Sequence, residues 1–481
     1  GWVGRPPYLA WPVRRSRTTG ENDVRSRLWR VVARSSGLRS CTLIGDMSLP
    51  RRTFLQASGG LAVALLGGCL EDAFCSDDEW PEGIIPSAEY VPSSLSIAVF
   101  EVRSTSVFLW TSATQAATAR VFLQARGQCS TFDLGALDLT ETTGFAGFIF
   151  ATGLAPNTRY RFRVTADTAE SSWAYFSTAP SLEEASDVHF LISADIGYDV
   201  ETYDVFAVMG AHRADFYLNI GDWPYADKLP TPARTLAEFR DRHHAVRSPV
   251  EIQAFLAGSP VYAIYDDHDI ADNWTSDFEN RDSERLLAGL QAWDEYFPLG
   301  RPERYRKWHW GCNADFFMLD TRRYRSPNRQ VDDESNTMLG SRQKDWLLAG
   351  LRESDAVFKL IITSVPLDFI GSIDSWESFA TERDSIFRFI TQEKIANVVV
   401  LTGDRHYFDA HHHANGLREY MFGPLAAGLG NPPDTQAPEV TERLLIRNYG
   451  ECLISGAPPV LTIRCRDVSG AIRFEETIVA T

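Results

Sequence analysis

The side chains of this sequence that could perform chemistry lie where apolar runs stop. The run at residues 261–269 reads VYAIYDDHD and ends on three carboxylates and a histidine. Three further runs end on Asp195, on Asp222, and on Asp404 with His406. One Gly-Asp turn after a strand is ordinary turn chemistry, but carboxylate and imidazole groups are also metal ligands. Four such endings in one chain therefore predict a metal site.

Buried strands must deliver these groups to one place. Apolar runs that end in polar clusters are typical of sheets covered on both faces, and ligands of open α/β sheets collect at the carboxyl ends of the strands. We expect such strands at residues 189–195, 214–222, 261–269, 358–366 and 397–406. Helix-like apolar spacing occurs between them, at residues 201–212, 283–296 and 341–351. This alternation predicts an α/β core, which residues 418–481 close with short strands and loops.

The segment before residue 180 has a different pattern. Its runs are short, rich in aromatic and β-branched residues, and separated by turn signals at nearly regular intervals. We place strands at residues 96–102, 106–113, 119–125, 145–154, 159–167 and 172–180. The spacing predicts a small antiparallel β-sandwich over residues 94–180. The stretch LAPNTRYRFRV followed by FSTAP resembles a fibronectin type III module.

The length and charge of the chain limit the classes of protein to which it can belong. With 481 residues, 44% of them apolar, it can bury the cores of two or three domains. The formal net charge is −17, although the first 46 residues carry nine arginines against three acidic residues. The rest of the chain is therefore more acidic still and would repel a phosphate backbone. We expect no nucleic-acid-binding surface.

The first 93 residues have the composition of a signal and a tether. Residues 1–46 show no sustained apolar period, and we expect that they are not translated; an arginine-rich mitochondrial presequence is the competing interpretation. Residues 47–69 read MSLPRRTFLQASGGLAVALLGGC, with paired arginines, a short apolar stretch and a small-residue exit. They resemble a twin-arginine export signal with a lipobox, which would make Cys69 lipid-modified. Residues 70–93 are acidic and contain prolines, as a tether would.

This interpretation predicts an exported bacterial lipoprotein on the periplasmic or cell-surface side of the membrane. The alternative for residues 47–69 is a buried apolar helix that follows a chance arginine pair. Export would permit disulfides, and five cysteines remain after Cys69. Cys452 and Cys465 flank the turn-like SGAPP within two apolar runs, so we expect them to pair.

Four motifs carry a family resemblance: DIG from Asp195, GDWPY from Gly221, DDHD from Asp266 and GDRH from Gly403. Together they resemble the binuclear metallophosphatase signature. The longer stretches AIYDDHDIADNW, FFMLDTRRYR, LGSRQKDWL and VVLTGDRHYF are similar to the PhoD-like alkaline phosphatases, and the GDxxY spacing also occurs in purple acid phosphatases. The resemblance runs from about Ser94 to the C-terminus. It implies an α/β metallophosphatase domain of mixed sheets flanked by helices at residues 187–481, preceded by the small β-sandwich.

The resemblance also implies two or more metal ions. Hydrolysis of a phosphate ester needs cations that neutralise its oxygens and lower the pKa of the attacking water. Asp222 holds the position of the carboxylate that bridges two metals in the family. The other implied ligands are Asp195, Tyr225 and His406 for Fe(III) or zinc, and Asp267 and Asp404 for calcium, magnesium or manganese.

His268 is expected to act beside the metals. Neighbouring residues of an extended segment point opposite ways, so His268 is not a ligand if Asp267 is one. It would protonate the leaving alkoxide or stabilise the transition state; a satisfied structural histidine is the alternative. Asp266 and Asp269 would orient His268 or the backbone. Asn273 and Arg322 lie in family-like segments and could hold substrate oxygens, although a surface arginine is the commoner outcome.

Two positions depart from the family's pattern. PhoD-like enzymes usually carry a cysteine ligand where this chain reads Ser193-Ala194-Asp195, and Asp195 could substitute for it. The strand that often delivers a histidine ligand ends here in TSVP, which leaves Ser364 in its place. Residues 411–413 are three histidines that could be further ligands, but after GDRHYFDA we expect a solvated loop.

The sequence thus predicts an exported, lipid-anchored phosphoesterase that cleaves phosphate mono- or diesters with a metal-activated water and His268 as the acid. Two alternatives belong to other classes of protein. A degenerate family member would keep the fold and act as a binding protein with an incomplete metal complement. An adhesion module would use the sandwich at residues 94–180, although no aromatic or charged patch stands out there.

Overall fold

The computed structural model describes residues 60–64, 80, 90–197, 202–228, 231–368, 372–433 and 437–481. The predictions for residues 1–46, for the signal at residues 47–69 with Cys69, and for most of the tether at residues 70–93 lie outside this part of the chain. Within the signal segment, residues Gly60–Ala64 form strand β1, which pairs in parallel with β6 (Ala146–Thr152). Among the described helices, none is long and apolar enough to cross a membrane.

The first part of the described chain forms strands in two sheets. Most of these strands lie where the sequence predicts them, but β5 was not expected. One group consists of β1, β2 (Leu95–Phe100), β3 (Ser106–Ala113) and β6. The other consists of β4 (Ala117–Ala125), β5 (Phe132–Leu139), β7 (Arg159–Ala166), β8 (Ala169–Glu170) and β9 (Ala174–Ser177). Val99, Leu109, Val121 and Phe162 belong to one buried cluster, so alternate residues of both groups share a core.

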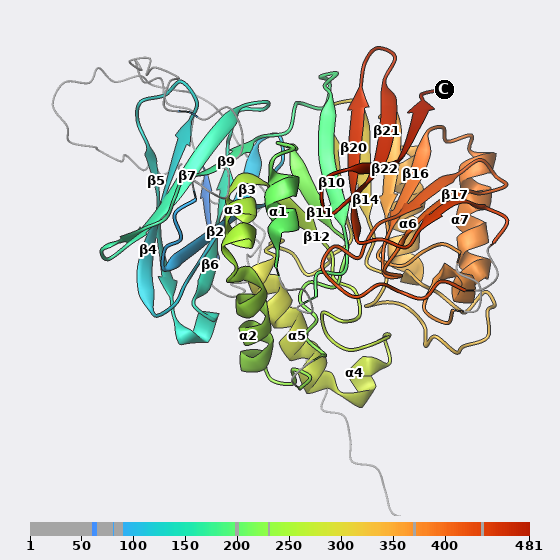
Figure 1. Cartoon of the computed structure of the whole chain (residues 1–481), viewed down its shortest axis with the longest axis horizontal. Helices are drawn as coiled ribbons and strands as arrows, with labels where there is room; N and C mark the ends of the chain where they lie inside the picture. The colour runs from blue at the N-terminus through green and yellow to red at the C-terminus, as the bar shows by residue number, and fades with distance from the viewer. Residues whose placement is uncertain are drawn as a thin grey trace, which may run out of the picture. The chain divides into compact units, whose positions relative to one another are not determined.

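The sheet that contains β2 extends into a ten-stranded sheet, and a separate seven-stranded sheet follows; both mix parallel and antiparallel strands (Figure 1). The first continues from β2 through β12 (Val261–Ala263), β11 (Phe216–Asn219), β10 (Val188–Ser193), β20 (Asn448–Ser455), β21 (Val460–Asp467) and β22 (Ile472–Val479). The second has the order β13 (Arg306–Trp310), β14 (Ala314–Met318), β15 (Phe358–Ile362), β16 (Val398–Thr402), β18 (Arg418–Met421), β17 (Phe408–His412) and β19 (Val440–Leu444). The central strands β10–β12 and β14–β16 run parallel within their sheets.

The two sheets pack face to face and helices cover their outer faces. Phe190, Phe216, Phe316 and Leu401 belong to the buried cluster between the sheets. The outer face of the first sheet packs against α1 (Asp204–Gly210), α2 (Leu236–Arg247), α3 (Val250–Gly258) and α5 (Ser283–Tyr296), with the short α4 (Phe278–Arg281) beside α5. The outer face of the second packs against α6 (Gly340–Arg352) and α7 (Ala380–Gln392). The predicted helices therefore exist, and because both faces of each sheet are buried, the central strands are apolar throughout.

A buried ion pair ties β2 to the later strands. Glu101 follows β2, and its carboxylate accepts bonds from Arg306 Nε on β13 at 2.9 Å to each oxygen. Arg306 Nη2 also donates to the carbonyl of Ala263 at 2.7 Å. Both charged residues are buried. Removing one partner of a buried pair costs about 3–5 kcal/mol, because the other charge stays unpaired. The pair therefore fixes how the first strands join the larger sheets.

The predicted disulfide between Cys452 and Cys465 is wrong. These residues lie on the neighbouring strands β20 and β21, but the register places Cys452 opposite Ile463 and Cys465 opposite Gly450. Both thiols are free and buried, and burial raises the pKa of each. Cys129, in contrast, is disulfide-bonded. A turn that joins two apolar runs reveals a hairpin, but it does not reveal which residues face each other.

Candidate metal centre

The ends of strands from both sheets bring the predicted ligands together. Asp195 follows β10 and Asp222 follows β11 in the first sheet, while His406 follows β16 in the second. The ligand atoms of these three residues lie within 4.8 Å of one another. Those of Asp222, Asp267 and His268 form a second such group, with Asp267 placed after β12. Asp222 belongs to both groups, as a bridging carboxylate must.

The backbone around this centre adopts conformations that most residues avoid. The φ angles of Asp195, Asp222, Asp404 and His406 are 61°, 61°, 80° and 62°, in the left-handed region. Such residues are uncommon, and they cluster at functional sites where the surrounding fold enforces them. Gly221 is tightly constrained as well, because a Cβ atom there would lie 2.4 Å from the Cβ of Asp266. Each polar side chain is therefore aimed by a turn that the fold holds in place.

Negative charge is concentrated in the centre. Asp195, Asp222 and Asp267 are at most 2% exposed. Among the described residues, neither oxygen of Asp195, nor Oδ2 of Asp222, nor Oδ1 of Asp267 has a hydrogen-bond partner. Burial and neighbouring carboxylates raise the pKa of Asp195, Asp222 and Asp404. Unpartnered buried carboxylates are costly without a cation, so this arrangement fits hard metal ions.

His406 and Tyr225 add a nitrogen and a phenol to the carboxylates. His406 Nδ1 donates to the carbonyl of Gly428 at 2.6 Å, which turns the lone pair of Nε2 towards the site. The hydroxyl of Tyr225 lies 2.8 Å from this Nε2, and Asp195 Oδ1 lies 3.6 Å from it. Burial and the charges of Asp222 and Asp195 raise the pKa of Tyr225 well above its usual value. A bound cation would counteract burial and the carboxylate charges, and would therefore lower the pKa of Tyr225.

His268 is held from both ends. Its backbone nitrogen donates to Asp222 Oδ1 at 3.1 Å, and its ring stacks on Tyr225 with centroids 4.7 Å apart. Its Nδ1 lies 2.9 Å from an oxygen of Asp227, so Nε2 is the nitrogen left for other contacts. Burial alone would lower the pKa of His268, but the carboxylates of Asp267 and Asp227 outweigh it and raise the pKa to about 9.

Sequence reasoning missed Asp227. It lies two residues beyond Tyr225 in the same loop and also accepts a bond from the backbone nitrogen of Asp272 at 2.7 Å. Asp227 belongs to none of the motifs. Its position two residues after the tyrosine of the GDxxY motif was the feature of the sequence that could have identified it. Carboxylates that fix a functional histidine through Nδ1 are a common supporting arrangement.

The side chains of Asp266 and Asp269 accept hydrogen bonds from neighbouring backbone and side-chain groups, and not from the ring of His268. Asp269 accepts bonds from the backbone nitrogens of Asp222 at 2.8 Å, Trp223 at 3.2 Å and Asp266 at 2.8 Å. It thus fixes the turn that carries the shared carboxylate. Asp266 accepts from Ser364 Oγ at 2.6 Å, so the serine at the expected histidine position supports a carboxylate.

Arg322 is fully buried between carboxylates. Its Nη2 lies 2.8 Å from Asp266 and its Nη1 lies 2.9 Å from Asp374. This placement indicates that Arg322 positions Asp266, and its contact with substrate stays a prediction.

Two further residues lie beside the proposed ligands. Arg405 Nε pairs with Asp404 Oδ2 at 3.0 Å; sequence reasoning missed it, although it stands within the GDRH motif. Asn273 donates its backbone nitrogen to Asp267 Oδ2 at 2.7 Å, so its main chain supports a predicted ligand.

The fold is similar to those of PhoD and of a purple acid phosphatase. A solved structure of PhoD matches with a TM-score of 0.69 and 22% identity, covering 80% of this chain and 88% of that one. The purple acid phosphatase PPD1 from yellow lupin (Lupinus luteus) seeds matches with a TM-score of 0.60 and 13% identity, covering 81% of this chain and 75% of its own. These two matches confirm the predicted core of mixed sheets flanked by helices.

The family follows from the sequence comparisons. The family model described as PhoD-like phosphatase matches residues 190–446, more than half of the chain. Alkaline phosphatase D of Bacillus subtilis (strain 168) is 25% identical over 416 residues, which cover 74% of this chain and 71% of that protein. This chain therefore belongs to the PhoD-like phosphatase family, and the resemblance seen in its motifs is confirmed.

We predict that Asp227→Ala lowers turnover on a phosphate ester about 10- to 100-fold, because His268 loses the acceptor that fixes its ring. Metal content should stay unchanged, and Asp227→Asn should retain more activity, since an amide oxygen still accepts the Nδ1 hydrogen. Steady-state kinetics with elemental analysis measure both. Asp272→Ala is the matched control, because that carboxylate is 63% exposed and 3.8 Å from His268 Nε2. Equal, small losses in the Asp227 and Asp272 variants would show that Asp227 does not position His268.

Proposed function

We propose that this phosphatase hydrolyses phosphate mono- or diesters with a water activated by two or more metal ions. The observation that carries the proposal is the position of Asp222: its ligand atoms lie within 4.8 Å of those of Asp195 and His406 in one group, and of that of Asp267 in another. Metal ions held there would neutralise the phosphoryl oxygens and lower the pKa of the attacking water. The chain's own part is to hold unpartnered, buried carboxylates at fixed positions before substrate arrives.

The donor set supports a division between two kinds of metal. Asp195, Tyr225 and His406 combine a carboxylate, a phenol and an imidazole, which suits Fe(III), with zinc as the second choice. Asp267 and Asp404 offer oxygens alone, which suits calcium, magnesium or manganese. Asp222 would bridge the two. Ser364 stays outside the ligand set in this proposal, because its hydroxyl is bonded to Asp266 and Thr321.

In this proposal His268 protonates the leaving oxygen. Asp227 holds its Nδ1, so the proton to be transferred sits on Nε2, and the side chain is 14% exposed. The proposal is supported by the stack of the His268 ring on Tyr225 and by the bond from the His268 backbone nitrogen to Asp222, because both residues are proposed metal ligands. The absent family cysteine and histidine ligands favour a second candidate, a binding protein with an incomplete metal complement. If the metal-loaded protein hydrolysed neither monoesters nor diesters, that result would favour the binding protein.

We predict that Asp222→Asn abolishes hydrolysis and lowers metal content together, because a bridging ligand serves both ions. Asp267→Asn should reduce turnover less, since an amide oxygen still coordinates a hard cation. Activity assays and elemental analysis of both purified variants provide the comparison. Near-normal turnover of Asp222→Asn would refute the binuclear assignment.

We predict that His268→Ala costs about 10²- to 10⁴-fold in turnover on an alkyl phosphate ester, the range of general acid catalysis, with metal content intact. On a nitrophenyl phosphate the loss should be much smaller, because that leaving group needs little protonation. The ratio of the two losses is the measurement. Equal losses on both esters would show instead that His268 stabilises charge on the phosphoryl oxygens.

We also propose a placement for the N-terminal parts. The order of paired arginines, apolar stretch and small-residue exit supports translation from Met47 and lipid attachment at Cys69 in an exported bacterial protein. The disulfide at Cys129 is consistent with an oxidising compartment. The shared core of the two groups of strands supports a fibronectin III-like sandwich at residues 94–180. Its strand β2 pairs with β12, so this sandwich is joined directly to the sheet of residues 187–481.

Mass spectrometry of the protein from its native host tests the export proposal. We predict a mature chain that begins at Cys69 and carries the mass of a lipid. A peptide from residues 1–46 would contradict the start at Met47. An unmodified Cys69 would contradict the membrane anchor.

A further inference from the structure

A second group of metal-ligand side chains lies on the outer face of the second sheet. His411 lies in β17, and His413 directly follows this strand, with its ring stacked on that of His411. The register places Glu419 of β18 directly opposite His411. The expectation of a solvated loop at residues 411–413 is wrong, because His411 and His412 belong to β17, and His411 and the side chain of His413 are 2% and 8% exposed.

The three side chains converge. His413 Nε2 lies 2.9 Å from Glu419 Oε2, and the two histidine rings stack with centroids 5.8 Å apart. One ligand atom from each of His411, His413 and Glu419 lies within 4.8 Å of the other two. Nδ1 of His411 is buried without a hydrogen-bond partner among the described residues. This group shares no residue with the groups that contain Asp222.

Glu419 carries a buried charge that the arginines near it do not neutralise. It is 0% exposed, and its Oε1 accepts from the backbone nitrogen of Leu367 at 2.8 Å. Arg443 is engaged with both oxygens of Asp409, at 2.7 and 2.6 Å. Arg383 pairs with Asp384 at 3.0 Å. Within the described chain the two imidazoles are thus the ionisable groups that contact Glu419, and a buried carboxylate needs a cation close by.

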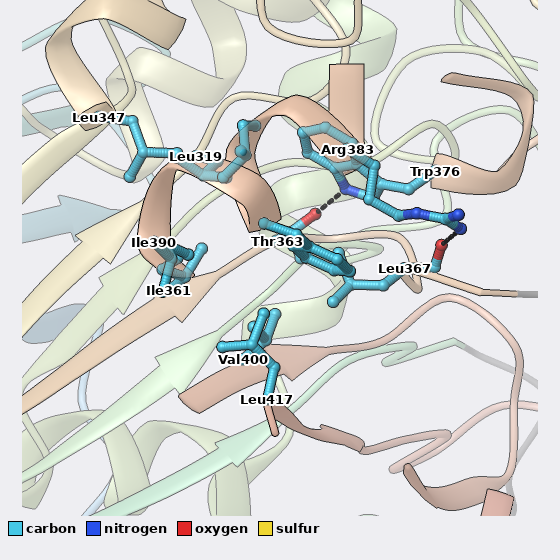
Figure 2. Close-up of a pocket in the computed structure, with 12 residues that line it drawn as sticks. Leu319, Leu347, Ile361, Thr363, Leu367, Trp376, Arg383, Ile390, Val400 and Leu417 are labelled. Atoms are coloured by element: carbon cyan, nitrogen blue, oxygen red, sulfur yellow. Dashed lines mark hydrogen bonds between the residues drawn. The ribbon is translucent and has the colours of Figure 1, made fainter. Parts of the chain in front are cut away.

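The group lies in largely apolar surroundings, where the side chains of His413 and Glu419 are 8% and 0% exposed. Helix α7 covers it, with the ring of Phe387 5.7 Å from that of His413. Next to it lies a cavity of about 20 Å³ lined by apolar side chains that include Leu367, Val400 and Leu417, with Arg383 donating to the carbonyl of Leu367 at its rim (Figure 2). Burial of this kind lowers the local dielectric constant and so strengthens the attraction between a carboxylate and a cation.

We propose that His411, His413 and Glu419 bind one zinc ion, or a transition metal of the same class, separate from the metal centre. Two imidazoles and one carboxylate form a ligand set that zinc accepts, with a fourth position for water. Tetrahedral ligands about 2.1 Å from zinc lie about 3.4 Å apart, a spacing that these atoms reach with small side-chain shifts. The ion would tie the β17–β18 hairpin to the segment at Leu367, which Glu419 already holds.

Zinc stoichiometry tests this proposal. The full chain is incubated with zinc chloride, freed of unbound metal, and analysed by elemental mass spectrometry. His413→Gln and His411→Ala should each retain one zinc per chain fewer than the wild type and keep phosphatase activity. His412→Ala is the matched control, because His412 faces the other side of β17 and pairs with Glu476 at 3.0 Å, so its zinc count should equal that of the wild type.

Equal zinc counts in the wild type, His411→Ala and His413→Gln would overturn the site. Circular dichroism establishes that each variant folds. If neither variant folds, anomalous scattering at the zinc edge from zinc-soaked wild-type crystals decides the matter without a variant. A peak between His411, His413 and Glu419 supports the proposal, and its absence there overturns it.

Discussion

Mutual repulsion among buried carboxylates is the constraint on which the rest of this structure depends. Asp195, Asp222 and Asp267 approach one another almost without exposure to water, and several of their oxygens lack hydrogen bonds within the described chain. Such a cluster is unfavourable by itself, so the fold must hold it together. Turns with left-handed φ angles at Asp195 and Asp222 do so, and Asp269 pins the turn of Asp222 through backbone bonds. The stored repulsion is what a metal ion relieves when it binds.

The second sheet supplies the positive charge that limits this repulsion. Arg322 contacts both Asp266 and Asp374, and Arg405 pairs with Asp404. Burial would raise the pKa of Asp374, but Arg322 outweighs it and holds the pKa below its usual value. Arg322 thus offsets the charge of Asp266 and Asp374, which are not proposed ligands, while Arg405 offsets part of the charge of the proposed ligand Asp404. Sheet-on-sheet packing therefore matters for the site, because Asp266, which follows β12 of the first sheet, finds its counter-charge in Arg322, which follows β14 of the second.

Local patterns predicted the strands and their polar ends well, because burial on both faces of a sheet leaves continuous apolar runs. The runs before Asp195 and Asp404 became β10 and β16. Partners that depend on tertiary contacts were missed: Asp227 is recognisable only once His268 lies beside it. The predicted pairing of Cys452 with Cys465 was wrong because it depends on the register between two strands, and the pattern of residues along each strand does not contain that register. His411 was misplaced because an alternation of polar and apolar residues cannot show that a helix covers the polar face.

Elemental analysis of the protein purified from its native compartment tests the central claim most directly. The account predicts at least two tightly bound metal ions per chain, with iron or zinc accompanied by calcium, magnesium or manganese. Removal of these ions should abolish hydrolysis of phosphate esters, and their return should restore it. Fully active protein with fewer than two metal ions per chain would contradict the account.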